Sequence, residues 1–317
     1  FLKNMSIKVE NLSKFYGTQQ AVKDISFEVK TGEIVGFLGP NGAGKSTTMK
    51  MITTYLTPNN GSILVNDIDA QENPIDVRRK IGYLPEQNPL YQEMNVVDYL
   101  KYTAELQSVP KENIPDAVKK MIKVCGLEEV KHKDISELSK GYKQRVGLAQ
   151  AMIHNPDVIL LDEPTSGLDP NQIIEIRKLI RDLGKHKTLM LSTHILQEVQ
   201  ATCDRVIIIN NGEIVADGTT DSLQKSFQGQ LNIHIIIKKD PKYGRDKLVS
   251  ALETIKNVEK VKIISDDENS WTVDLTATKG IDVREEIFRK IVSLDMVLLE
   301  LHQDETSLED IFRKLTT

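Results

Sequence analysis

The chain has 317 residues, of which 39% are hydrophobic and 27% charged, and its formal net charge is −5. This composition excludes a disordered chain and gives no electrostatic reason to expect a nucleic-acid partner. The two cysteines, Cys125 and Cys203, lack a metal-binding spacing, and no apolar run approaches the roughly 20 residues that a membrane span needs. We therefore expect a cytoplasmic protein without a secretory leader, which reaches a membrane only through another chain.

The first informative segment is a glycine-rich stretch, GFLGPNGAGKSTTMKMITTYL, at residues 36–56. An apolar run over residues 34–38 predicts a buried strand, and apolar residues recur at helical spacing over 47–56. Between them, residues 39–46 match the pattern G-x-x-x-x-G-K-[ST] in its strand–loop–helix setting. A flexible turn before a helix is the alternative, but uncovered backbone N–H groups at a helix N-terminus are suited to cradle phosphate oxygens.

The pattern predicts a nucleoside-triphosphate site. In this interpretation Lys45 reaches the β- and γ-phosphates, and Ser46 supplies a hydroxyl to Mg²⁺. The predicted nucleotide-binding residues are Gly39, Pro40, Asn41, Gly42, Ala43, Gly44, Lys45, Ser46 and Thr47.

Two carboxylates, Asp162 and Glu163, follow the apolar run Val158–Leu161. Such a pair alone fits a surface equally well, but with a phosphate loop upstream it favours a hydrolase. Asp162 would hold the water shell of the metal, and Glu163 would orient and polarise the attacking water. A further strand, predicted over Thr188–Ser192, leads to His194. A lone histidine is commonly structural, yet the carboxyl end of a parallel strand is where a γ-phosphate contact is expected.

The segment ELSKGYKQRVGLAQAM, residues 137–152, resembles the signature of the ATP-binding-cassette (ABC) ATPases. In that family two cassettes face head to tail, and each signature closes on the nucleotide held by the partner. The resemblance implies that Ser139 binds the γ-phosphate in trans. The usual wording is L-S-G-G-Q, whereas this chain has lysine and tyrosine at the third and fifth places. The implied signature residues are Leu138, Ser139, Lys140, Gly141 and Tyr142.

Other positions take roles from the same resemblance. Tyr16 matches the aromatic residue that stacks on adenine, although alone it would be read as a strand residue. The segment IGYLPEQNPLY, residues 81–91, matches the one whose glutamine contacts Mg²⁺ and couples to the membrane subunit. Glu86 stands at that place and Gln87 follows it, so either side chain fits the role. Asp169 matches the residue that crosses the dimer interface.

The expected fold is α/β, with a P-loop NTPase core of the ABC-ATPase type over residues 5–220. An antiparallel β layer is expected over residues 6–37, and a helical subdomain over about 90–153. A hairpin is predicted to turn at Asn211-Gly212. Residues 227–317 show the order βαββαβ, which predicts a ferredoxin-like α+β domain with a role in dimer stabilisation or regulation.

Taken together, the resemblance implies an ATPase subunit of an ABC transporter, similar to the gliding-motility-associated branch. It implies ATP and Mg²⁺ as cofactors, a separate integral-membrane permease, and a second ATPase subunit that is identical or related. The protein would lie on the inner face of the cell membrane and bind no nucleic acid. The alternatives are a soluble ABC ATPase of translation or DNA repair, and a regulatory module with little turnover. Co-purification and a phosphate-release assay would separate them.

Overall fold

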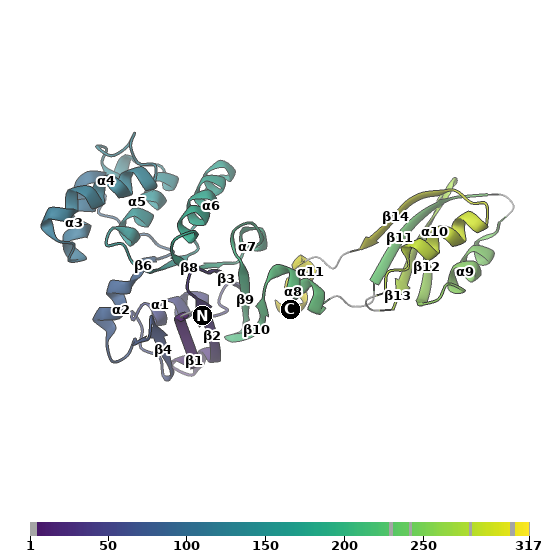
Figure 1. The fold of residues 1–317 in the computed structure, drawn as a ribbon, viewed down its shortest axis with the longest axis horizontal. Helices are drawn as coiled ribbons and strands as arrows, with labels where there is room; N and C mark the ends of the chain where they lie inside the picture. Colours follow the sequence, from purple (N-terminus) through teal and green to yellow (C-terminus); the bar gives the residue numbers. More distant parts are fainter. Residues whose placement is uncertain (1–4, 228–230, 241–242, 279–280, 305–307, 317) are drawn as a thin grey trace. The chain divides into compact units, whose positions relative to one another are not determined.

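The computed structural model describes residues 5–227, 231–240, 243–278, 281–304 and 308–316 (Figure 1). The chain divides into two compact units, Phe1–Thr220 together with Lys314–Thr317, and Asp221–Arg313. The last residues group with the first unit, where the Asn210 side-chain amide donates to the carbonyl of Leu315 at 3.0 Å. The expected accessory domain, in contrast, ran to residue 317.

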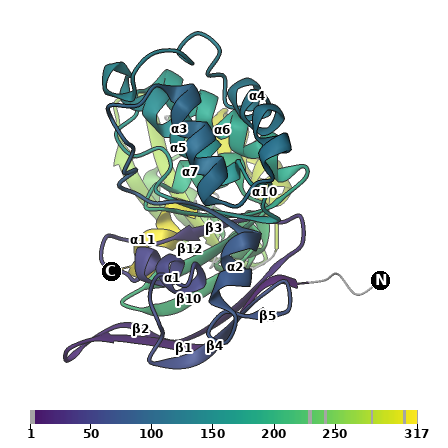
Figure 2. The ribbon, with the colours of Figure 1, turned by 90° about the vertical axis from the view of Figure 1, so that its left-hand side faces the viewer.

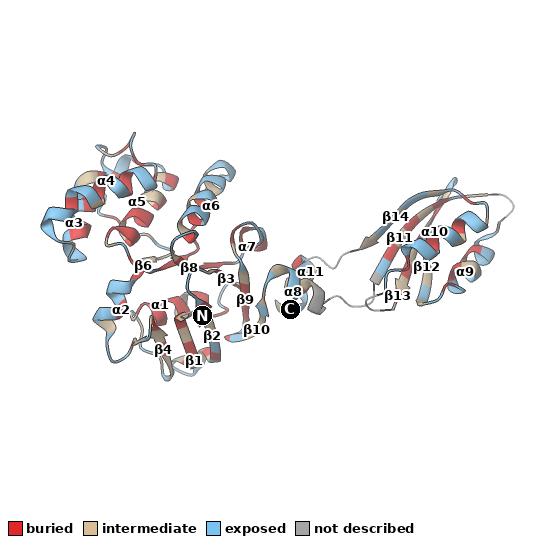
Figure 3. Cartoon of the chain, viewed as in Figure 1, coloured by how far each residue is buried: buried red, intermediate tan, exposed pale blue. Residues whose placement is uncertain are grey.

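The first unit is built on a six-stranded sheet whose central strands are buried along their whole length (Figure 3). In spatial order its strands are β10 (Glu213–Gly218), β9 (Arg205–Asn210), β3 (Ile34–Leu38), β8 (Thr188–Thr193), β7 (Val158–Asp162) and β6 (Ile81–Leu84). All neighbouring pairs are parallel except β9 and β10. The carboxyl ends of β3, β7 and β8 therefore meet at one edge, where ligands bind in open α/β sheets.

A second sheet forms the antiparallel layer. Its order is β2 (Gln19–Lys30), β1 (Met5–Tyr16), β4 (Asn60–Val65) and β5 (Ile68–Asp69). The buried apolar residues of β1 and β2 share one core with the central sheet and α1 (Lys45–Ile52). The layer ends at Lys30, and β3 joins the parallel sheet, so the expected layer over 6–37 was too long.

Helices cover the opposite side of the first unit, as Figure 2 shows. The helical subdomain contains α3 (Val96–Leu106), α4 (Ile114–Val124) and α5 (Lys140–Met152), with 3₁₀ turns at Lys111–Asn113 and Ile135–Glu137. Their apolar faces share one core with α6 (Pro170–Gly184) and the central strands. The first unit also contains α2 (Pro74–Lys80) and α7 (Leu196–Thr202), and α8 (Thr220–Phe227) begins where the chain passes into the second unit.

Local signals explain several element ends. Asp169 caps α6 and Pro170 occupies its first turn. The β9–β10 hairpin turns on Asn211 and Gly212, whose φ angles of 48° and 83° suit a two-residue turn. Helix α1 ends at Ile52 rather than at residue 56, because Thr54 takes a φ of 59°, which no helix continues.

The second unit has the ferredoxin-like topology that the sequence predicted. Its elements are β11 (Leu231–Lys238), α9 (Arg245–Glu253), β12 (Val258–Asp266), β13 (Ser270–Ala277), α10 (Arg284–Ser293) and β14 (Leu298–Asp304), and α11 (Leu308–Thr316) follows. The sheet is antiparallel in the order β12-β13-β11-β14. One face packs its isoleucines and valines against α9 and α10. Among the described residues, no helix is both long and apolar enough to cross a membrane.

Candidate nucleotide site

The loop between β3 and α1 takes a backbone course that only glycine accommodates easily. Gly42 and Gly44 have φ angles of 81° and 107°, in the left-handed region. A Cβ on Gly44 would lie 2.7 Å from the carbonyl oxygen of Ala21, so the loop passes against β2. A Cβ on Gly42 would meet nothing within 4 Å. The loop is therefore held against the fold at Gly44 and faces open space at Gly42.

This open space is a cavity of about 460 Å³ at the carboxyl edge of the central sheet. It is lined by Ala21, Asn41, Gly42, Gly44, Lys45, Ser46, Thr47, Glu86, Glu163, Ser166 and His194. The structure thus brings residues from four separate predicted segments into one site.

Lys45 lines the cavity and is only 6% exposed. Its Nζ donates to the carbonyl oxygens of Gly39 at 2.8 Å and Pro40 at 3.2 Å. The same Nζ lies 3.5 Å from a carboxylate oxygen of Glu163. Because the backbone carbonyls of the loop hold this buried ammonium, it places a fixed positive charge at the cavity.

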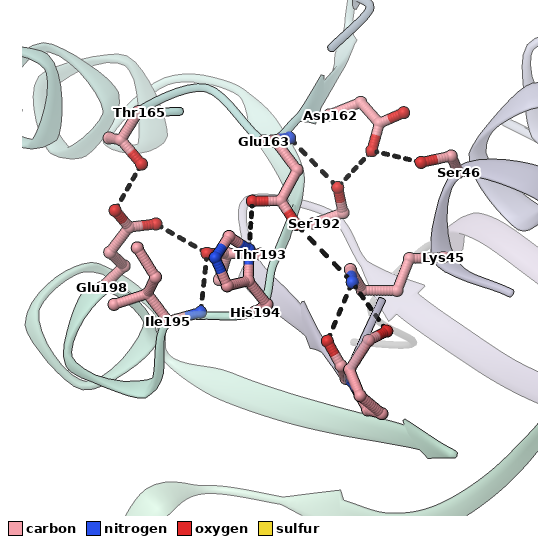
Figure 4. Close-up of polar contacts among 12 residues, drawn as sticks. Lys45, Ser46, Asp162, Glu163, Thr165, Ser192, Thr193, His194, Ile195 and Glu198 are labelled. Atoms are coloured by element: carbon pink, nitrogen blue, oxygen red, sulfur yellow. Dashed lines mark hydrogen bonds and ion pairs between the residues drawn. The ribbon is translucent and has the colours of Figure 1, made fainter. Parts of the chain in front are cut away.

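Asp162 ends β7 and is surrounded by hydroxyl groups (Figure 4). Ser46 Oγ donates to its Oδ1 at 3.1 Å, and Ser192 Oγ donates to the same oxygen. The Tyr83 hydroxyl lies 3.4 Å from Oδ2. Burial, followed by the negative charge of Asp162, raises the pKa of Tyr83, which therefore stays a neutral donor. A carboxylate beside a serine hydroxyl is a donor set that suits Mg²⁺.

Glu163 has an unusual backbone for its residue type. Its φ is 47°, in the left-handed region that branched and long side chains rarely adopt, and the residue is only 7% exposed. Its N–H donates to the backbone carbonyl and to the hydroxyl of Ser192, each at 3.2 Å. Such strain persists only where the surroundings hold it, and it is concentrated at functional sites.

The carboxylate of Glu163 stands between two nitrogen-bearing side chains. His194 Nδ1 lies 2.9 Å from Oε2, while Lys45 approaches Oε1 (Figure 4). The two strand-end residues are neighbours because Asp162 of β7 pairs with Ser192 of β8. A carboxylate fixed in this way at a phosphate loop can polarise a water molecule for attack.

The signature segment lies elsewhere in the same chain. Ser139, Gly141 and Tyr142 line a second cavity of about 370 Å³, with Gly126, Glu128, Glu129, Arg145, Gln172 and Glu175. Ser139 is exposed and caps α5, accepting from the backbone N–H of Tyr142 at 3.4 Å. Leu138 is buried, and the Nζ of Lys140 lies 2.0 Å from the position that a Cβ on Gly167 would take.

Contacts within the same chain favour glycine at position 141. A Cβ at this position would lie 2.6 Å from Cδ of Gln172, on α6. The glycine therefore leaves room for the end of the Gln172 side chain beside the first turn of α5.

Several predicted residues do not line the first cavity; besides the signature residues these are Tyr16, Gly39, Pro40, Ala43, Gln87, Asp162 and Asp169. Tyr16 lies at the end of β1 and is 48% exposed. Gln87 lines a third cavity together with Glu86, Ser46 and Asp162, and of these Glu86 and Ser46 also line the first cavity. Asp169 caps α6 by accepting from two backbone N–H groups, each at 3.0 Å.

Sequence reasoning missed the residues that support the site: Tyr83, Thr165, Ser192, Thr193 and Glu198. Four carry hydroxyls, and two of these directly precede His194 in the string LSTH. Their position next to His194 could have marked Ser192 and Thr193 as site residues, but it does not indicate which carboxylate each hydroxyl contacts.

A phosphate loop, two strand-end carboxylates and a histidine around one cavity define a nucleoside-triphosphate hydrolase of the P-loop type. Comparison with known proteins extends this result. The family profile described as "ABC transporter" matches residues 22–166. The chain is 39% identical over 238 residues to "Uncharacterized ABC transporter ATP-binding protein YxlF" of Bacillus subtilis, covering 75% of this chain and 78% of that protein.

A second relative extends over nearly the whole chain. "Bacitracin transport ATP-binding protein BcrA" of Bacillus licheniformis is 32% identical over 311 residues, which cover 98% of this chain and 96% of that protein. A solved structure, the dimeric post-hydrolysis state of the cassette MJ0796 bound to ADP and Pi, is 27% identical with a TM-score of 0.61. It covers 67% of this chain and 98% of that chain.

The chain belongs to the ABC transporter ATP-binding proteins. The predicted family, fold class and activity are thereby confirmed: the protein is an ATP-binding and ATP-hydrolysing subunit that powers transport. The similarity to the gliding-motility-associated branch stays a prediction.

Proposed function

We propose that ATP binds in the first cavity with its triphosphate along residues 39–47, and that Mg²⁺ is held between Ser46 and Asp162. The uncovered loop at Gly42 and the 3.1 Å contact between the two metal-binding side chains fit these groups. When bound, Mg²⁺ would neutralise charge on the phosphates. Glu86 reaches the same cavity and is proposed as a third group near the metal.

In this proposal Glu163 is the general base, and the observation that carries it is its position between Lys45 and His194. Glu163 accepts the proton of the attacking water, and His194 holds the carboxylate in place through its 2.9 Å contact. Lys45 stabilises the negative charge that develops on the phosphoryl oxygens. Tyr16 is proposed to stack on adenine.

We further propose that Ser139 acts on the nucleotide of a second ATPase subunit. Its exposure, and its place in a different cavity from the phosphate loop, support a role in trans. The remaining signature positions Leu138, Lys140, Gly141 and Tyr142 would shape this surface, and Asp169 would cross the interface. The MJ0796 cassette, a relative in fold and sequence, was solved as a dimer.

The permease would contact the third cavity, where Glu86 and Gln87 lie side by side in the chain. Both side chains line it, and we propose that this pair couples nucleotide state to the membrane subunit. The protein would then lie on the inner face of the cell membrane. Residues 5–220 would form the ATPase domain, and residues 227–317 an accessory domain that stabilises the dimer or regulates it.

The proposal is tested by comparing Lys45→Ala with Lys80→Ala. Lys80 is an exposed lysine paired with Asp157 at 3.2 Å, away from the cavity. Lys45→Ala should lose ATP binding in calorimetry and phosphate release in a steady-state assay, whereas Lys80→Ala should keep both. An unchanged ATP dissociation constant in Lys45→Ala would show that the triphosphate binds elsewhere.

A further inference from the structure

A buried carboxylate that the proposed mechanism does not use lies directly behind the site. Glu198 is on α7, which follows His194, and is only 2% exposed. Its Oε2 accepts from Thr193 Oγ1 at 2.7 Å, and its Oε1 accepts from Thr165 Oγ1 (Figure 4). Burial of a carboxylate costs free energy unless hydrogen bonds compensate it. Here both oxygens accept such bonds, which indicates that the fold holds this carboxylate in a defined position.

Each of these two hydroxyls belongs to a segment that carries a proposed reacting group. Thr193 directly precedes His194, and its Oγ1 also accepts from the backbone N–H of Ile195 at 3.1 Å. Glu198 thereby fixes the residues on both sides of the histidine. Thr165 lies two residues after Glu163, in the loop that leaves β7.

The backbone of Glu163 needs such support. Its φ of 47° is held from one side by the two contacts of its N–H with Ser192. On the other side, the carbonyl of Glu163 accepts from the N–H of Ser166 at 3.1 Å, within the loop that Thr165 anchors to Glu198. A left-handed conformation at a non-glycine residue persists when contacts on both sides determine it.

A further group extends the network to α6. Arg177 Nη2 lies 3.9 Å from Oε1 of Glu198, and within the described residues its buried Nε has no hydrogen-bond partner. The guanidinium supplies positive charge to the buried carboxylate from the helix that Asp169 caps.

We propose that Glu198 is a positioning residue for ATP hydrolysis, which ties the loop after Glu163 and the residues around His194 to α7 and so sets the contact between these two side chains. The inference rests on the proposed roles of Glu163 and His194. Glu198 touches neither side chain and acts only through the two threonines. A misplacement of about 1 Å at a reacting group lowers a rate by about 100-fold.

The test measures kcat and KM for ATP in Glu198→Ala, Glu198→Gln, Thr165→Val and Thr193→Val. Thr202→Val is the matched control, because Thr202 is a buried polar residue on the same helix whose Oγ1 has no partner within the described residues. We expect kcat to fall by about 10- to 100-fold in Glu198→Ala, with KM within about twofold of the parent. The control should keep both constants.

A purely structural role would give a different result. In that case Glu198→Ala would lose kcat only in proportion to its unfolded fraction, which thermal unfolding measures at the assay temperature. Adding Thr165→Val to Glu198→Ala should lower kcat no further if both act through one network. Should Glu198→Ala fail to fold, the two threonine variants, which preserve side-chain shape, carry the same test.

Two outcomes separate this inference from the proposed function. If Glu163→Gln turns over ATP at the parental rate, the role of the base is wrong. If Glu163→Gln is inactive while folded Glu198→Ala keeps the parental kcat, the positioning role alone is overturned. The positioning role is also overturned if KM rises while kcat stays constant, since the network would then act on binding.

Discussion

Replacing Glu163 by glutamine tests the hydrolytic site most severely, because the change keeps the shape of the side chain. The amide can still contact His194, 2.9 Å away, but it cannot accept a proton from water. Loss of a positioned general base typically lowers a rate by about 10²- to 10⁴-fold. At about 1.36 kcal/mol for each factor of ten, this corresponds to about 2.7 to 5.4 kcal/mol of transition-state stabilisation.

The affinity for ATP should not decrease in Glu163→Gln. Glu163 carries negative charge beside Lys45, at a separation of 3.5 Å, so its neutralisation leaves more positive charge for the phosphates. We therefore expect an equal or lower ATP dissociation constant together with the loss of turnover. Phosphate release and calorimetry on the same preparation measure both. Glu213→Gln is the control, since Glu213 forms an exposed ion pair with Lys23. Parental turnover in Glu163→Gln would refute the assignment of the base.

Three further predictions concern the signature, the adenine and acid stability. Gly141→Ala should change the free energy of unfolding in urea by no more than about 1 kcal/mol, because its Cβ meets only the movable end of the Gln172 side chain and alanine favours the helix; a loss above about 2 kcal/mol would show that Gln172 cannot move aside. Tyr16→Ala should weaken ATP binding about tenfold through lost stacking, with kcat at saturation unchanged; unaltered affinity would argue against the stack. Burial lowers the pKa of His154, whose Nε2 contacts the Ile81 carbonyl, so the unfolded chain takes up the proton first as pH falls below about 6.5. Stability should therefore decline below that pH by at most about 1.4 kcal/mol per unit, and less steeply in His154→Gln.

The elements that sequence reasoning predicted well are those whose signal is local. The run Val158–Leu161 is apolar throughout because its strand is buried on both faces, and the structure places it inside the parallel sheet. The phosphate loop is likewise a local pattern, since its glycines are required by the backbone conformation of the loop itself. The βαββαβ order sufficed for the second unit, where β13 alternates strictly between buried and partly buried residues.

Contacts between segments that are distant in the chain could not be predicted from the sequence. Glu163 and His194 meet across 31 residues of chain because of the register between β7 and β8, which neither string contains. Glu198 was overlooked because a glutamate in the string LQEV is ordinarily a solvent-facing residue of a helix. Its burial follows from the hydroxyls of Thr165 and Thr193, which only the fold brings to it.

The most direct test of the nucleotide site is a crystal structure of Glu163→Gln grown with saturating ATP and Mg²⁺. We expect the triphosphate along residues 39–47, with its terminal phosphate within hydrogen-bond distance of Lys45 and His194. A cavity without nucleotide under these conditions, or a nucleotide whose phosphates lie away from the loop, would contradict the account of how this protein holds ATP.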